Sequence, residues 1–310
     1  MMRKKPENSA IQEMFARRLR ALLFDDPSGV PPWLEMISGG EGPGLFQPGE
    51  APWVIHADFG TVVGGVRALL MQALHPGSLA GVHQHSRYQS DPLGRLAGTI
   101  RWLTITTFAS REAVAKEAAR INRMHSRVRG NYQSAKCETL SYRASDPHLL
   151  LWVHIAFMDS FLRCHQLFAT APIPGGADDY VRLWAKSVEP LGLREVPLNE
   201  SELVAALNRF QSELAVTDET REVIRWLRKP PLPVASLPVY ELLFQAALAS
   251  LPAGCRDLLD LKGVPLPVIR PVARGLLKCM RAAIGPENML SDSAVARLER
   301  WQEMNRGAEA

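Results

Sequence analysis

Four residues in one predicted helix have the types and spacing of an anion-binding surface. Arg95, Thr99, Trp102 and Thr106 lie at positions i, i+4, i+7 and i+11 within residues 93–108, so a helix presents all four on one face. A guanidinium, two hydroxyls and an indole suit a bound anion or the polar edge of a cofactor. An arginine that lies along the surface at a helix start explains the same pattern equally well.

A histidine falls within the apolar face of the next predicted helix, residues 111–129. At about 100° per residue, His125 shares a narrow stripe with four apolar side chains. They are Val114, Ala118, Ile121 and Val128. A histidine there is expected to be buried, and the pattern alone favours a paired core residue because buried polar groups are usually hydrogen-bonded. Metal or haem ligation is the alternative, since neutral imidazole is the commonest metal ligand.

A short turn at Ala109 and Ser110 joins these two predicted helices. Ser110 is a good N-cap for the second helix, and a connection this short favours antiparallel packing. Arg95 and His125 would then lie at the ends of their helices away from the turn. We expect these two side chains to face one pocket.

His75, His83 and His85 form a looser group. Their spacing is compatible with zinc, but there is no HExxH motif and no acidic residue between His75 and Asp91 to serve a catalytic metal. A loop whose histidines cap or line a pocket is therefore favoured over a zinc site.

A long helix is predicted from Pro147 to about Phe168, opened by the Asp146 cap. Asp159 shares a face with Trp152 in this apolar sequence and should pair with a cation or a polar donor. His154 has Met158 at i+4, where a helical metal site would need a second ligand. A structural hydrogen bond is predicted for His154.

The elements that carry these residues are all predicted to be helices, because no alternating apolar stretch is long enough to demand a strand. Residues 77–92 are expected to form a loop or broken helix, and 141–145 a turn. The predicted fold is all-α. Residues 1–52 are expected to form an N-terminal helix and an irregular entry segment, and 53–228 a single helical domain that carries the candidate site residues. Residues 229–310 form a proline-rich connector and C-terminal helices that pack on the core.

Gly64 and Gly65, in the predicted helix over residues 61–74, indicate close approach of another element.

Composition excludes several classes of protein. The chain has 310 residues, 46% hydrophobic and 22% charged, which is too apolar for a disordered chain. The net charge of +4 comes from scattered basic residues, so no nucleic-acid partner is expected. Cys137, Cys164, Cys255 and Cys279 are too far apart for a zinc ribbon. Phosphate-loop, Rossmann, GxSxG and EF-hand motifs are absent.

No signal peptide and no transmembrane segment are recognisable, so a cytoplasmic protein is expected. The first predicted helix carries Arg17, Arg18 and Arg20 beside leucines. Peripheral contact with a membrane surface is the alternative to an ordinary amphipathic helix there.

Four segments occur in an order that resembles the MpaB and latex-clearing-protein (rubber oxygenase) catalytic-domain family. They are GGVRALLMQALHP, HSRYQSDPLGRLAGT, MHSRVRG and YRASDPHLLLWVH. The resemblance covers roughly Trp53 to Leu227. It implies a globin-like all-α fold, b-type haem, and use of molecular oxygen to cleave carbon–carbon double bonds of isoprenoids, in polyisoprene or in a farnesyl side chain.

The resemblance also assigns roles to residues. His125 looks like the proximal ligand of the haem iron, and Arg95 and Thr99 look like the catalytic pair beside the haem, where a guanidinium stabilises a propionate or bound oxygen. In rubber-cleaving members a lysine precedes the threonine and caps the distal iron position, whereas this chain has Gly98. The departure implies a distal side that is open, filled by water or covered by another group such as a histidine, and it argues against rubber as the substrate.

We therefore predict a haem b-dependent oxygenase acting on an alkene of an isoprenoid or lipid-like small molecule, with a separate electron donor as a candidate partner. Two alternatives stay open. One is a non-enzymatic protein that stores, carries or senses haem or a gas. The other is an all-α binding module without haem, in which His125 is a paired core residue.

Overall fold

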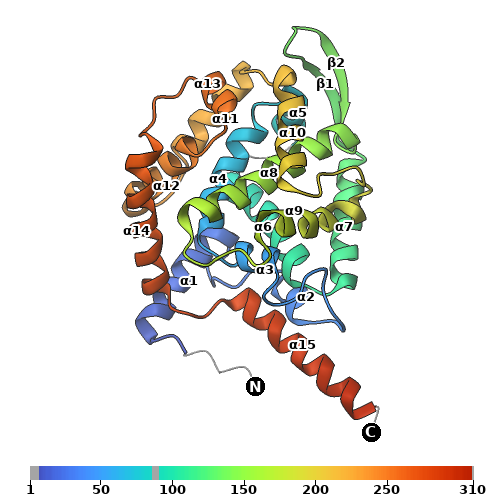
Figure 1. Cartoon of the computed structure of the whole chain (residues 1–310), viewed down its shortest axis with the longest axis vertical. Coiled ribbons are helices and arrows are strands. Elements are labelled where there is room, and N and C mark those ends of the chain that lie inside the picture. Colours follow the sequence, from blue (N-terminus) through green and yellow to red (C-terminus); the bar gives the residue numbers. More distant parts are fainter. Residues whose placement is uncertain (1–6, 86–90, 309–310) are drawn as a thin grey trace.

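The computed structural model describes residues 7–85 and 91–308. Within these ranges the fold is built from α-helices and one small two-stranded sheet, which confirms the predicted all-α class (Figure 1). The helices are α1 (Ala10–Phe24), α2 (Leu34–Ser38), α3 (Ala51–His56), α4 (Gly60–Gln72), α5 (Pro76–His85), α6 (Pro92–Phe108), α7 (Arg111–His125), α8 (Pro147–Phe168), α9 (Gly176–Trp184), α10 (Glu200–Phe210), α11 (Asp218–Arg228), α12 (Leu237–Ala249), α13 (Ala253–Leu259), α14 (Leu266–Ile284) and α15 (Met289–Ala308). Short 3-10 turns are η1 (Ala185–Leu191), η2 (Gln211–Glu213) and η3 (Val234–Ser236), and the strands are β1 (Arg129–Gln133) and β2 (Thr139–Arg143).

Helices α4 and α8 pack closely at the centre of the molecule (Figure 1). Gly64 of α4 makes this approach possible: a Cβ atom there would lie 2.8 Å from Cδ1 of Phe161 and 3.2 Å from the carbonyl oxygen of Ser160. The predicted close approach at Gly64 is thus confirmed. A Cβ atom at Gly65 would meet nothing within 4 Å, so the same expectation was wrong for that residue.

A buried ion pair crosses the α4–α8 contact. The Arg67 guanidinium lies 2.6 Å from the Asp159 carboxylate and is almost fully buried. Arg67 also donates hydrogen bonds to Oγ of Ser160 and to the carbonyl oxygen of Ser250, at 2.7 and 3.1 Å. The prediction that Asp159 pairs with a cation is confirmed, and the network ties α4 and α8 to the end of α12.

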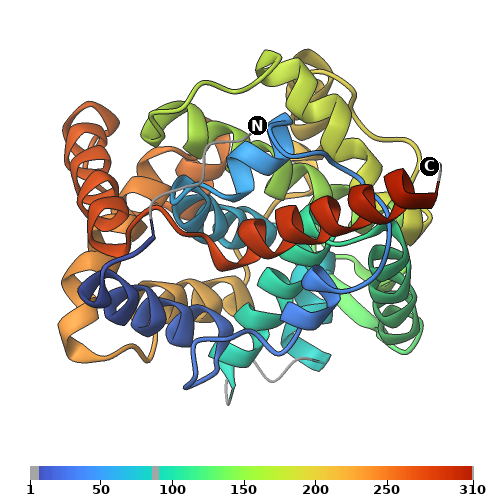
Figure 2. The ribbon, with the colours of Figure 1, turned by 90° about the horizontal axis from the view of Figure 1, so that it is seen from below.

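The C-terminal helices close the core from one side. Phe244 of α12 and Leu277 of α14 are completely buried in the central apolar cluster. Helix α15 crosses the underside of the molecule and packs on α2 (Figure 2). There the buried Arg297 donates a 2.8 Å hydrogen bond to the carbonyl oxygen of Ile37.

The predictions for the end of α7 and for the segment that follows it differ from the structure. Helix α7 begins with the predicted Ser110 cap, whose Oγ accepts from the Ala113 N–H, but it ends at His125 and not at residue 129. Residues 129–133 and 139–143 pair as an antiparallel hairpin where a helix end and a turn were expected. These strands are short, and their sequence shows no apolar period because little besides Tyr142 is buried.

Two segments predicted to be irregular contain helices. Residues 76–85 form α5, whose apolar first half is buried, where a loop or broken helix was expected. The predicted loop continues into residues 86–90, which lie outside the described residues. The entry segment 25–52 also contains the single-turn helix α2.

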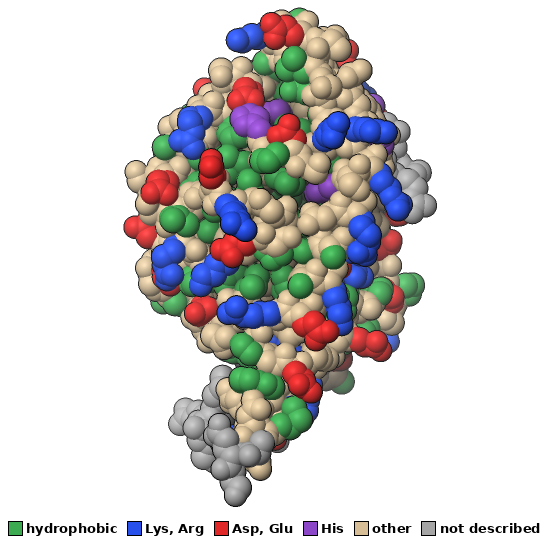
Figure 3. Space-filling view, turned by 90° about the vertical axis from the view of Figure 1, so that its right-hand side faces the viewer, with side chains coloured by type: hydrophobic (Ala, Val, Ile, Leu, Met, Phe, Trp, Pro, Cys, Tyr) green, Lys and Arg blue, Asp and Glu red, His purple; other side chains and the backbone are tan. Residues whose placement is uncertain are grey.

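Across the described ranges no single helix has the length and hydropathy of a membrane span. The segments Val234–Ala249 and Ala253–Leu259, bent by 119°, meet these criteria only when taken together. On the face shown in Figure 3, basic side chains are interspersed with acidic and apolar ones, and histidines reach the surface beside acidic groups.

Candidate active site

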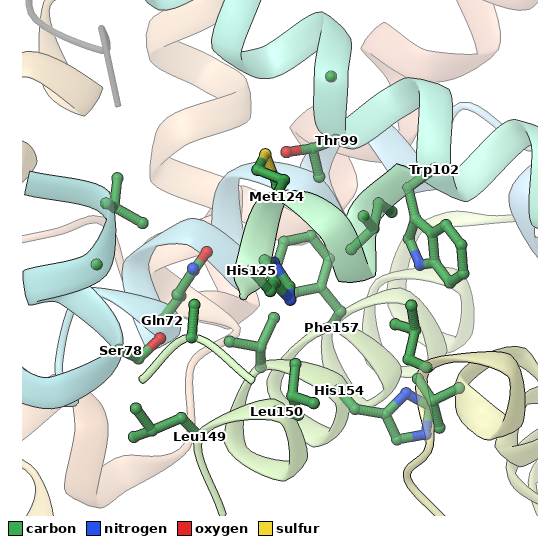
Figure 4. A pocket seen from close by; sticks show the side chains of 18 of the residues that line it. Gln72, Ser78, Thr99, Trp102, Met124, His125, Leu149, Leu150, His154 and Phe157 are labelled. Atoms are coloured by element: carbon green, nitrogen blue, oxygen red, sulfur yellow. The ribbon is translucent and has the colours of Figure 1, made fainter. Parts of the chain in front are cut away.

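A cavity of about 390 Å³ lies between α5, α6, α7, α8 and η1. This volume falls within the range of sites that bind small molecules, roughly 300–1,000 Å³. Most of the side chains in its wall are apolar, among them Leu149, Leu150 and Phe157 of α8. Figure 4 shows these side chains on the same cavity as Thr99, Trp102 and His125.

Three of the four residues on the predicted polar face of α6 reach the cavity. Arg95, Thr99 and Trp102 line it, because their spacing keeps them on one side of the helix. Thr106 is fully buried and does not line the cavity, so the face turns into the protein core before the helix ends.

Arg95 contributes a positive charge that no carboxylate neutralises within the described part of the chain. Its Nη1 donates a 2.9 Å hydrogen bond to Oγ1 of Thr99. Part of the Arg95 side chain is exposed to solvent at the cavity wall. The surrounding protein removes part of the hydration of the guanidinium, and this lowers the pKa of Arg95. Arginine stays protonated in proteins, so the cavity wall presents a cation with unused donors to an anionic ligand.

His125, the last residue of α7, lines the same cavity as Arg95, the shared placement that their positions in the sequence suggested. It is half-buried, and its Nδ1 is buried without a hydrogen-bond partner among the described residues. Burial lowers the pKa of His125, and the charges of Arg95 and Arg120 lower it further. The imidazole is therefore neutral near pH 7, the form that binds a metal ion.

Gly98 forms part of the wall between Arg95 and Thr99. A Cβ atom at Gly98 would find nothing within 4 Å, so the cavity is open at this point of α6. A Cβ atom at position 98 could therefore be accommodated without displacing a neighbour.

His154 lines the cavity, although a structural hydrogen bond was predicted for it. Its side chain is 6% exposed, and Nε2 has no partner among the described residues, so that prediction was wrong. Burial lowers the pKa of His154 to about 3. Ser187 of η1 also lines the cavity with a buried, unpartnered Oγ, and so does Ser78 of α5. Ser187 carries no sequence signal, because a serine in a short 3-10 turn is usually a local cap.

His75, His83 and His85 do not come together as a zinc site, and His85 lines the cavity, as the favoured prediction has it. His83 lies 3.3 Å from the Glu222 carboxylate, and Nε2 of His85 lies 3.1 Å from the carbonyl oxygen of Arg129. His75 instead lies beside His148 and Glu213. Three elements distant in sequence bring these residues together, so spacing could not reveal the group.

His75, His148 and Glu213 have the composition of a metal site, with ligand atoms within 4.8 Å of one another. Nε2 of His148 lies 2.8 Å and Nε2 of His75 lies 3.4 Å from the same Glu213 oxygen. The Ser78 N–H donates to Nδ1 of His75 at 3.3 Å, which leaves the ring proton on Nε2. His75 therefore acts in this structure as a hydrogen-bond donor to Glu213 and offers no lone pair at Nε2 to a metal ion.

Residues 53–282 match the family model described as "ER-bound oxygenase mpaB/B'/Rubber oxygenase, catalytic domain". The matched region includes the whole cavity and continues into α14. The chain belongs to this family of oxygenases. No significant match was found among curated proteins or solved structures.

Proposed function

We propose that this protein is a haem b-dependent oxygenase that uses molecular oxygen on an alkene of an isoprenoid or lipid-like small molecule. The observation that carries the proposal is the placement of Arg95 and His125 on one mainly apolar cavity. Among the described residues, a cation without a carboxylate partner and a neutral imidazole with an unpaired ring nitrogen are the groups that a haem with anionic propionates requires.

The residues present fit this cofactor. His125 would bind the iron, and Arg95, supported by Thr99, would bind a propionate or face the oxygen side. When bound, haem would supply the redox-active iron that activates oxygen. The apolar wall would exclude water and keep an alkene in place, which favours oxygenation of a hydrophobic substrate over competing reactions with water.

The chain's own residues hold the protonation states that this role needs. Desolvation and two nearby guanidinium groups keep His125 neutral, so its ring nitrogen is free to bind a metal without first losing a proton. Thr99 accepts one donor of Arg95 and thereby orients the guanidinium along the wall of α6. Gly98 leaves the space beside this pair open.

The proposal is tested by absorption spectra of the purified protein, oxidised, reduced and with carbon monoxide, followed by oxygen uptake with isoprenoid alkenes. We expect a haem spectrum and oxygen consumption that depends on the alkene. Haem binding without oxygen-dependent turnover of any alkene would support storage, transport or sensing. A colourless protein after expression with haem supplied would contradict the proposal.

A further inference from the structure

Two buried polar groups line the cavity and are not among the residues assigned above to the proposed cofactor. His154 of α8 and Ser187 of η1 are 6% and 0% exposed, and neither Nε2 of the histidine nor Oγ of the serine has a hydrogen-bond partner among the described residues. Burying such groups unpaired is unfavourable, so native proteins rarely keep them without a function.

These two groups differ from the other polar groups of the cavity by position. In the view of Figure 4, Thr99, the residue that holds Arg95, lies above His125, whereas His154 lies below it and to its right. Ser78, with Gln72, lies on another side of His125, beside Leu149. Ser187 is followed in the wall by the apolar residues Val188 and Leu191. His154 and Ser187 are thus unpaired polar groups on a cavity whose wall is mainly apolar.

We propose that His154 and Ser187, which line the same cavity, act as polar anchors that bind a neutral oxygen group of the substrate, an alcohol or a carbonyl, while the apolar wall binds its hydrocarbon chain. This inference rests on the proposed function, because it takes the bound molecule to be the substrate. It narrows the substrate class to oxygen-bearing isoprenoids or lipids. A pure hydrocarbon would leave both groups unpaired.

The protonation state of the anchor determines the kind of oxygen it prefers. Burial holds the pKa of His154 near 3, so the ring is neutral at physiological pH and offers one donor and one acceptor. A serine hydroxyl also donates and accepts. A neutral hydroxyl or carbonyl is satisfied by such a pair, whereas a carboxylate there would lack a counter-charge from either group.

The test compares two ligands of the same chain length: farnesol, an isoprenoid alcohol, and β-farnesene, a hydrocarbon. Their dissociation constants are measured by equilibrium dialysis against the protein as purified. In a purely apolar cavity the alcohol would bind more weakly, because its hydroxyl loses water without compensation. We expect the wild-type protein to bind farnesol at least as tightly as β-farnesene.

His154→Leu should shift the ratio of the two dissociation constants about tenfold toward the hydrocarbon, the size expected for one buried hydrogen bond. Ser187→Ala should shift it in the same direction by a smaller factor. Phe157→Leu is the matched control, since it alters the apolar wall of the same cavity and should weaken both ligands without changing their ratio.

Three results would overturn the anchor: preference of the wild-type protein for β-farnesene, no binding of either ligand, or a ratio that His154→Leu leaves unchanged. If His154→Leu loses haem while the ratio of the two dissociation constants stays unchanged, the histidine belongs to the cofactor site. That result would also overturn the anchor. The binding ratio does not depend on turnover. A protein that keeps the farnesol preference but lacks oxygenase activity would therefore refute the proposed function and leave the anchor standing.

Discussion

Nη1 of Arg95 donates a 2.9 Å hydrogen bond to Oγ1 of Thr99, one turn further along α6. This contact orients the guanidinium on the cavity wall and uses one of its five donors. Within the described residues no carboxylate takes up the remaining charge. The pair is thus preorganised on the wall of a mainly apolar cavity, where the proposed function has it bind an anion.

Arg95→Leu should weaken haem binding by about tenfold or more, because a hydrogen bond to a charged group contributes about 1.5–3 kcal/mol. The haem affinity of Arg95→Lys should lie between those of Arg95→Leu and the wild type. Lysine keeps the positive charge but lacks the planar guanidinium that can donate two parallel hydrogen bonds. Titration of the apoprotein with haem measures both. Equal haem affinity in all three proteins would mean that Arg95 does not face the propionates. Arg300→Leu is the matched control, because Arg300 donates to the carbonyl oxygen of Ser38 and does not line the cavity.

Gly98→Lys should change the spectrum of the haem-loaded protein. The open space at Gly98 predicts a ferric spectrum of the high-spin type that shifts when imidazole is added. The lysine side chain can enter this space and supply an internal ligand, so the variant should be low-spin and insensitive to imidazole. A low-spin wild-type protein that ignores imidazole would show that another group already covers the iron.

Stability should fall between pH 7 and pH 5. Burial lowers the pKa of His56 and His154 to about 3, whereas in the unfolded chain both titrate near 6.5. Below about pH 6.5 the unfolded state binds more protons than the folded one, so each residue contributes a loss of about 2 kcal/mol by pH 5. Urea unfolding at the two pH values measures this difference.

His154→Leu separates the contribution of one histidine to this pH dependence. The variant should be more stable than wild type at pH 7 by about 1 kcal/mol, because an unpaired buried polar group is removed. Its loss of stability between pH 7 and pH 5 should be smaller by about 2 kcal/mol. An unchanged pH dependence would show that His154 is solvated or paired in solution.

Arg67→Met should destabilise the fold by about 3–5 kcal/mol, because Asp159 would keep a charge without its partner. The double variant Arg67→Met with Asp159→Leu should recover most of this loss, since the remaining charge is also removed. Urea unfolding of the single and double variants gives the coupling energy. Additive losses would show that the two groups do not interact.

The helix faces that line the site could be predicted from the sequence. The contacts between residues of elements far apart in the sequence could not. The spacing of Arg95, Thr99 and Trp102 predicts a common face because helical periodicity is local. The unpaired state of His154 was not predictable, because it depends on what η1 and the neighbouring helices place around the ring. The contact of His75 with Glu213 depends on tertiary packing in the same way.

The hairpin of β1 and β2 shows a second limit. Its strands are five residues each, and apart from Tyr142 their side chains are largely exposed, so no apolar alternation marks them. The same hairpin ends α7 at His125, and its Tyr142 also lines the cavity. The apolar stripe that includes Val128 extended the predicted helix past this point to residue 129.

The absorption spectrum of His125→Ala, expressed and purified beside the wild-type protein with haem supplied, tests the central claim most directly. The matched control is His148→Ala, which removes an exposed histidine outside the cavity wall. The account predicts a Soret band in the wild type and in His148→Ala, and its loss in a folded His125→Ala protein. Full retention of haem by His125→Ala would contradict it.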